Sequence, residues 1–485
     1  MHKIVSLIIV VLTATVVPAR AEVPRDRNAD FILDHVNVVP MTRETVLFDR
    51  SVIVRDGKIV AITDIRSAAL YQSATQIDGH GKYLMPGLSD MHVHLRMPPQ
   101  DFFDLNLALG ITTVFNMGIA DGNGKYDHLA LRASIAAGSM DGPRYLVSGP
   151  QLDSGNISMS TVDQVLQEHV DRGYDAVKVH GDLSPELYNA IIAGVRARGL
   201  RVRGHGQHMM PLAETLRMDS VEHVEELLYI SQDSALGEEA KFGVEEEGNI
   251  NHFLTAYYHN ISRLQDHAYR AGVVRQIAQS GVYWDPTIVI YSMIPIYVSD
   301  ESFDALAHDP RLQYLPDSMR SESLDPNKNE YRAGLVPVFS KFLLSVGDRT
   351  SVAHHFDENV SLLLTLTKEL HDAAVPLLIG SDAFGALVPG YAPHQEMELF
   401  VKAGLTPYET LQAATVNPAK YLGELDQAGT IEVGKRADFI LLGANPLVDI
   451  RNAADVRGVF THAKWFSHDD LTMRLSRTAK DAGSN

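Results

Sequence analysis

The chain has 485 residues, of which 45% are hydrophobic and 21% charged, as is typical of a globular protein with a large core and unlike a disordered or fibrous chain. Its formal charge of −19 argues against nucleic acid or an anionic membrane as a partner. Because the chain has no cysteine, disulfides and thiolate ligands are excluded, and a metal site must use histidine, carboxylate or a lysine-derived oxygen.

The N-terminus has the pattern of a secretory signal peptide. Lys3 precedes an apolar run over residues 4–17, and Ala19 and Ala21 are small residues suited to cleavage after Ala21. The run is shorter than the ~20 residues that span a bilayer, which disfavours a membrane anchor. We therefore predict a signal peptide over residues 1–21, a periplasmic or secreted protein, and no membrane association after cleavage.

Both ends of the mature chain contain short β-branched runs that are broken by turns. "SVIVRDGKIVAITDI" lies near the start, and "GTIEVGKRADFILLGANPL" and "VRGVFTHAKWF" lie near the end. This similarity predicts one small β domain built from residues 22–85 and 425–485, with the remainder as an insertion.

The middle, residues 86–424, alternates short apolar strands with longer helical patterns. The helix in "SPELYNAIIAGVRARG" has Ser184 and Pro185 as a start signal and Gly199 as a stop. The strand candidates favour a closed parallel (β/α)8 barrel over a doubly wound sheet. They are "GLSDMHVHL", "GITTVFNMG", "RYLVSG", "YDAVKVHG", "LRVRGHG", "DSVEHV", "GVYWDPTIVI" and "VPLLIGSDA".

Two connections are too long for one helix each. Residues 231–261 and 295–348 are predicted to be insertions on the active-site side, with a composition typical of lids.

Ligand-capable side chains occur on five of the apolar strands. His92 and His94 are two residues apart, so a strand would present both to one face, although a chain with 21 histidines contains such a pair by chance about once. The whole set is harder to attribute to core packing, because burying each side chain without a partner costs several kcal/mol. It comprises His92, His94, Lys178, His205, His223 and Asp382.

Lys178 lies inside a β-branched run, where an unpaired lysine is rare. It is either an ion-paired barrel lysine or an amine whose lowered pKa permits carboxylation to a carbamate that bridges two metals. His180 shares its parity and could face the pocket, or it could be a solvated residue at the strand end.

Several of these stretches, with "IDGHGKYLMPGLSDMHVHL", "LLIGSDA" and "AGLTPYETLQAATVNPAKYLG", resemble the amidohydrolase superfamily, and specifically the imidazolonepropionase-like branch that includes Xaa-Pro dipeptidases. The resemblance implies a TIM-like barrel with a small β-sandwich from both chain ends. It also implies that His92, His94 and Asp382 bind one zinc-like ion, that His205 and His223 bind a second, and that carboxylated Lys178 bridges them. Asp382 would move the proton between water and the leaving group.

The chain departs from the dipeptidase pattern after the third strand. "SGPQLDSGNIS" replaces a Gly-Gly-His stretch whose histidine helps to bind substrate, and no arginine is identified that would bind a substrate carboxylate. Tyr229 is a candidate pocket residue, with a packed aromatic at the loop base as the alternative. His394 is expected to cap and pack a helix.

The resulting hypothesis is an exported, metal-dependent hydrolase of an amide C–N bond in a dipeptide, an N-acyl amino acid or a cyclic amide, acting through metal-activated hydroxide. The alternatives are an esterase or lactonase with the same site, and a catalytically silent ligand-binding barrel. Zinc is the expected metal, as one or two ions, with manganese or cobalt as substitutes. A homo-oligomer is an implication of the resemblance only.

Overall fold

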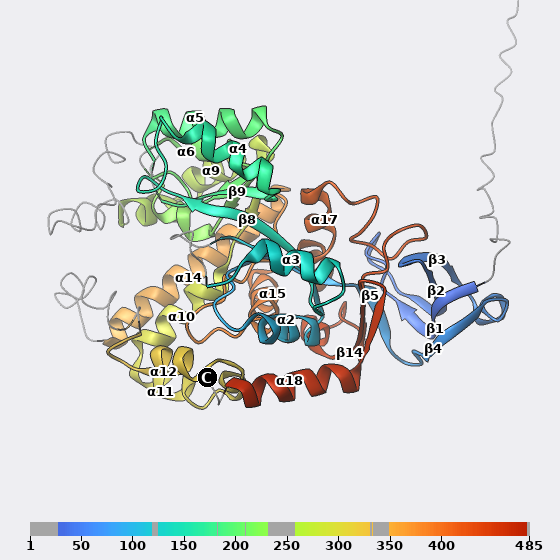
Figure 1. The fold of residues 1–485 in the computed structure, drawn as a ribbon. Coiled ribbons are helices and arrows are strands. Elements are labelled where there is room, and N and C mark those ends of the chain that lie inside the picture. Colours follow the sequence, from blue (N-terminus) through green and yellow to red (C-terminus); the bar gives the residue numbers. More distant parts are fainter. Residues whose placement is uncertain are drawn as a thin grey trace, which may run out of the picture.

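The computed structural model describes residues 28–118, 125–181, 183–208, 210–230, 258–329, 332 and 349–482. Figure 1 shows a large α/β body beside a smaller sheet. The predicted signal peptide lies outside the described residues. Within the described part of the chain, no helix is long and apolar enough to cross a bilayer.

The smaller sheet is built from both ends of the chain, as the sequence predicts. Its strands form one mixed, hydrogen-bonded sheet in the order β15-β14-β13-β5-β1-β2-β3, and β4 pairs with β1. The strands are β1 (Asn28–Val38), β2 (Leu47–Arg55), β3 (Lys58–Thr63), β4 (Gln72–Asp78), β5 (Tyr83–Pro86), β13 (Phe439–Leu442), β14 (Val456–Thr461) and β15 (Lys464–Ser467).

Aromatic packing and a tight turn stabilise this sheet. The ring of Phe31 from the N-terminal part lies 4.9 Å from Phe460 and 5.2 Å from Trp465 of the C-terminal part. Asp56 and Gly57 both have positive φ, 50° and 67°, as the two-residue hairpin between β2 and β3 requires.

The larger body contains seven parallel strands in the order β12-β11-β10-β9-β8-β7-β6. They are β6 (Leu88–Val93), β7 (Ile111–Asn116), β8 (Arg144–Leu152), β9 (Ala176–Val179), β10 (Val202–Gly204), β11 (Ser220–Glu222) and β12 (Tyr283–Asp285). The predicted eighth strand lies between the two edges: the Leu378 N–H donates to Trp284 O at 2.9 Å, and the Met91 N–H donates to Ile379 O at 2.7 Å. This segment closes the barrel, so the predicted fold class is confirmed.

Helices connect the strands and surround the barrel (Figure 1). The α-helices are α1 (Ile65–Ala68), α2 (Pro99–Ala108), α3 (His128–Ala136), α4 (Val162–Arg172), α5 (Pro185–Ala197), α6 (Leu212–Thr215), α9 (His267–Ser280), α10 (Ile288–Val298), α11 (Asp300–Leu306), α12 (Asp317–Leu324), α14 (Arg349–Asp372), α15 (Tyr391–Ala403), α16 (Pro407–Ala414), α17 (Val416–Leu422) and α18 (His468–Ala482). The 3-10 helices are η1 (Val224–Leu228), η2 (Pro310–Tyr314) and η4 (Ile450–Ala454). Helix α5 has the predicted start, because the Ser184 side chain accepts the Leu187 N–H.

One predicted strand needs correction. The seventh strand was expected to continue to Ile290, but β12 ends at Asp285 because Pro286 and the left-handed Thr287, with φ 46°, start α10 instead. The described part of the connection 295–348 contains α11, η2 and α12. Residues 231–257 and 333–348 of the two predicted insertions lie outside the described residues.

The C-terminal helix α18 is attached to the barrel by a buried carboxylate on α2. Asp104 is 0% exposed and accepts hydrogen bonds from Arg474 and Arg477 of α18. Arg474 also pairs with Asp141. The last helix therefore joins the small sheet to the barrel wall.

We predict that Asp104→Asn lowers the free energy of unfolding by about 2 kcal/mol, because charge-assisted bonds to both arginines are weakened. The shift is measured as the midpoint of urea denaturation. Asp304→Asn, at an exposed position of α11, is the matched control. Equal effects of the two variants would contradict the attachment.

Candidate metal centre

The predicted ligand residues meet at the C-terminal ends of the barrel strands, where barrel enzymes carry their active sites. His92 is the penultimate residue of β6, Lys178 lies in β9, and His205 and His223 directly follow β10 and β11. Gly204 allows β10 to approach β9 just before His205, since a Cβ there would lie 2.0 Å from Val179 O. The strand order thus brings together residues that are far apart in the sequence.

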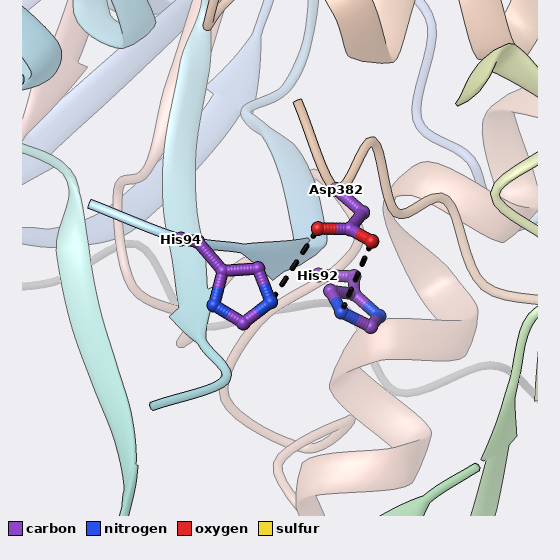
Figure 2. A group of neighbouring side chains, drawn as sticks. All are labelled: His92, His94 and Asp382. Atoms are coloured by element: carbon purple, nitrogen blue, oxygen red, sulfur yellow. Dashed lines mark ion pairs between the residues drawn. The ribbon is translucent and has the colours of Figure 1, made fainter. Parts of the chain in front are cut away.

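His92, His94 and Asp382 form one close group of possible ligands (Figure 2). The Nε2 of His94 lies 3.4 Å from Oδ1 of Asp382, and the Nε2 of His92 lies 3.9 Å from Oδ2. Two ligands of a tetrahedral zinc ion are about 3.4 Å apart, given bonds of about 2.1 Å. These three residues could therefore share one ion with little rearrangement.

The remaining histidines extend this group into a row of imidazoles. Ring centroids are 4.9 Å apart for His92 and His223, 4.6 Å for His223 and His205, and 4.5 Å for His205 and His180. His205 is the most accessible of the four candidate histidine ligands, with 25% of its side chain exposed, whereas His92 has 1%. His180, which the sequence analysis considered as a pocket residue that could bind substrate, lies next to His205 at the more exposed end of this row.

Each of the four candidate histidine ligands hydrogen-bonds through Nδ1 to an oxygen atom, which is a carboxylate or carbonyl oxygen in three cases and a hydroxyl oxygen for His223. When Nδ1 carries the proton and donates it, Nε2 keeps the lone pair that a metal requires. The bonds are His92 to Glu222 Oε2 (2.8 Å), His94 to Gly118 O (2.6 Å), His205 to Glu226 Oε1 (2.8 Å) and His223 to Thr287 Oγ1 (2.6 Å).

Burial keeps these imidazoles neutral. It lowers the pKa of each far below the usual range, to about 3 for His94, and the ammonium of Lys178 lowers it further. Burial also raises the pKa of Asp382 to about 7. The cluster therefore offers neutral nitrogen donors beside a carboxyl group that can exchange a proton near neutral pH.

Lys178 is 0% exposed, and its Nζ has no hydrogen-bond partner among the described residues. Among these residues no carboxylate lies within 4.0 Å of Nζ. Within this part of the chain, Lys178 therefore does not form the ion pair that the sequence left open. Burial lowers the pKa of Lys178 to about 8, so a neutral amine is accessible. A carbamate on this amine would supply an oxygen donor.

A second group of possible ligands comprises His92, Glu222 and Asp285. An arginine binds both of its carboxylates. Arg203 donates from Nε and Nη2 to the two oxygens of Glu222, at 2.8 and 2.9 Å, and lies 3.4 Å from Asp285. Although burial raises the pKa of Glu222, the guanidinium of Arg203 outweighs it and holds this pKa below its usual value. This group is an ion pair, and Glu222, Arg203 and Asp285 were missed in the sequence.

Three residues at the site have a strained backbone. His223, Thr287 and Asp382 have φ values of 68°, 46° and 41°, which non-glycine residues rarely adopt. Asp90 accepts the N–H and hydroxyl of Ser381, at 2.9 and 2.5 Å, and so holds the segment that carries Asp382. Asp90 was also missed in the sequence.

Arg96, two residues after His94, is an arginine near the ligand cluster that the sequence did not single out. It is exposed, lies over the Phe384 ring at 5.7 Å, and its charge lowers the pKa of His94 and Asp382. No salt bridge joins it to a carboxylate of the described residues. It places a positive charge beside the ligand cluster.

Two other candidates have supporting positions. Tyr229 lies 5.7 Å from the His208 ring and hydrogen-bonds the Glu225 carboxyl. His394 is buried and donates to Leu109 O at 2.8 Å, in agreement with the packing role expected for it.

The cluster fits a divalent metal on its own chemistry. The Nε2 of His92 and the Nζ of Lys178 are buried without a hydrogen-bond partner in the described part of the chain, and an ion would satisfy this nitrogen of His92. His92, His94 and Asp382 each offer an atom within 4.8 Å of the other two.

The fold occurs in solved structures. Bottromycin amidohydrolase superposes with a TM-score of 0.67 and 20% identity over 93% of this chain and 90% of that chain. A Xaa-Pro dipeptidase with bound methionine in the active site has a TM-score of 0.57 and 17% identity over 90% and 99%. At these identities the likeness concerns the fold.

Sequence relatives include an adenine deaminase from Desulforamulus reducens, 27% identical over 197 residues, which span 36% of this chain and 32% of that protein. A dihydroorotase from Ligilactobacillus salivarius is 22% identical over 88% of this chain and 94% of that protein. An imidazolonepropionase from Geobacillus kaustophilus is 33% identical over 15% and 18%.

The sequence model of the Amidohydrolase family matches residues 83–466, which include every candidate ligand described above. This match confirms the resemblance recognised in the sequence. The chain therefore belongs to the amidohydrolase family.

Proposed function

We propose that the protein is a divalent-metal-dependent hydrolase that cleaves an amide C–N bond in a small substrate with a carboxylate, such as a dipeptide, an N-acyl amino acid or a cyclic amide. The observation that carries the proposal is the convergence of His92, His94 and Asp382 with neutral, correctly oriented imidazoles. The names of the relatives, which include a dipeptidase and a dihydroorotase, support the same bond class.

His92, His94 and Asp382 would hold one ion, and His205 and His223 would hold a second, with carboxylated Lys178 between them. A divalent cation in this position supplies a Lewis acid that acidifies water and polarises the scissile carbonyl. Zinc suits the nitrogen and carboxylate donors, and manganese or cobalt could replace it.

Asp382 is placed to move the proton. It is held by Asp90 through Ser381 and by its own N–H, which donates to His92 O at 2.7 Å. It accepts the proton of the attacking water and returns it to the leaving nitrogen.

In this proposal, Arg96 selects a substrate that carries a carboxylate. Its guanidinium is exposed next to the cluster and can form a two-pronged bond to a carboxylate. A substrate carboxylate bound here would leave its amide carbonyl directed at the ligand residues.

We predict that Lys178→Ala lowers the metal content below that of the wild type and reduces amide hydrolysis at least about 100-fold, because it removes the side chain that would carry an oxygen donor for the metal. The metal content per chain is measured by mass spectrometry after loading with zinc and bicarbonate. Turnover is assayed on dipeptides, N-acyl amino acids and matched esters. Lys420→Ala, at an exposed position of α17, is the control.

Unchanged metal content in Lys178→Ala would contradict the bridging role. A wild type that binds no zinc, manganese or cobalt and turns over no substrate would instead favour a ligand-binding barrel. Faster cleavage of esters than of matched amides would favour the esterase alternative.

We predict that Arg96→Gln raises KM for a carboxylate substrate by about 10- to 100-fold, as expected for the loss of a charge-assisted bond. The same change should alter KM for the corresponding carboxamide by less than about 3-fold. Arg43→Gln, an exposed arginine near β2, is the control. An equal effect on both substrates would show that Arg96 does not bind the carboxylate.

We also propose that the mature protein is exported, on the strength of the N-terminal sequence. Expression of the full chain in a bacterium with a periplasm should yield a protein that begins at Glu22. Mass spectrometry of the cell fractions checks this, and a full-length chain confined to the cytoplasm would contradict export.

A further inference from the structure

Two buried carboxylates four residues apart each support a different candidate ligand. Glu222 ends β11 and Glu226 lies in η1, so both belong to one short segment that also carries His223. Both are nearly or fully buried, at 0% and 3% exposed.

Glu222 supports His92. Its Oε2 accepts the Nδ1–H of His92 at 2.8 Å, and Arg203 binds both of its oxygens. Arg203 is itself held between aromatic rings, with its guanidinium carbon 4.7 Å from the centre of Phe115 and 5.4 Å from that of Tyr421.

Glu226 supports His205. Its Oε1 accepts the Nδ1–H of His205 at 2.8 Å, and its Oε2 is 2.6 Å from Nε2 of His208. Gly206 makes room for this contact, because a Cβ at that position would lie 2.8 Å from Oε2.

We propose that Glu222 and Glu226 are positioning residues that set the metal affinity of the two ligand positions separately: Glu222, fixed by Arg203, for the position of His92, and Glu226, fixed by His208, for that of His205. This inference rests on the proposed metal-dependent function. An anionic acceptor on Nδ1 orients the ring and strengthens Nε2 as a donor, and its loss typically costs 10- to 100-fold in affinity.

The separation follows from the contacts. The hydrogen bonds of Glu222 go to His92 and Arg203, and those of Glu226 go to the side chains of His205 and His208. Neither carboxylate bonds the ring that the other supports, so neutralising one should leave the other ring in place.

The test is a crossed measurement of zinc affinity by competition with a chromophoric chelator, made on the full chain and independent of activity. His223→Ala leaves the His92 position, and His94→Ala leaves the His205 position. We expect Glu222→Gln to weaken the affinity for zinc about 10- to 100-fold in the His223→Ala background and less than about 3-fold in the His94→Ala background. Glu226→Gln should show the reverse pattern.

Glu225→Gln is the matched control, since this half-buried neighbour hydrogen-bonds Tyr229 and Tyr291 instead of a candidate ligand. Glu222→Gln leaves the Arg203 charge buried, so the double variant Arg203→Met/Glu222→Gln provides the same comparison if the single variant does not fold.

Equal weakening in both backgrounds, or the same weakening by Glu225→Gln, would overturn the separate roles while leaving the metal-dependent function intact. Unchanged zinc affinity in both Glu222→Gln and Glu226→Gln would also overturn the separate roles and leave the metal-dependent function intact. Zinc binding that is absent even in the wild type would overturn the proposed function, and this inference with it.

Discussion

The ion pair between Arg203 and Glu222 is the interaction on which the polar centre of the barrel depends. Both side chains are 0% exposed, so the loss of either partner would leave an uncompensated charge where burial is most costly. Asp285 lies beside them, and burial together with the charge of Glu222 raises its pKa well above the usual range. Through Glu222 this pair also fixes the first histidine of the row.

Several residues of the centre have backbone conformations that are unfavourable for non-glycine residues. Three residues at the site have positive φ, and the segment that carries Asp382 closes the barrel through a few hydrogen bonds instead of a full strand. Asp90 compensates by binding both donors of Ser381. A rigid barrel thus stabilises a strained rim, as is common where side chains must be held in an exact arrangement.

The sequence predicted the barrel and the sheet built from both ends, because strand parity and apolar runs are local patterns. It also singled out the six candidate ligands, whose role in metal binding stays a prediction. It did not reveal that Glu222, next to His223 in "DSVEHV", faces His92, since that contact joins residues 130 positions apart. The parity of "RVRGHG" places Arg203 and His205 on one face and was the available signal for Arg203. Arg96 was overlooked because its position depends on how the loop after β6 folds over Phe384.

The most direct test of this account is anomalous diffraction at the zinc edge from crystals of the zinc-loaded protein. We predict one peak between His92, His94 and Asp382 and a second beside His205 and His223, with density for a carbamate on Lys178. A peak between His92, Glu222 and Asp285, or no peak within bonding distance of these histidines, would contradict the assignment of the centre.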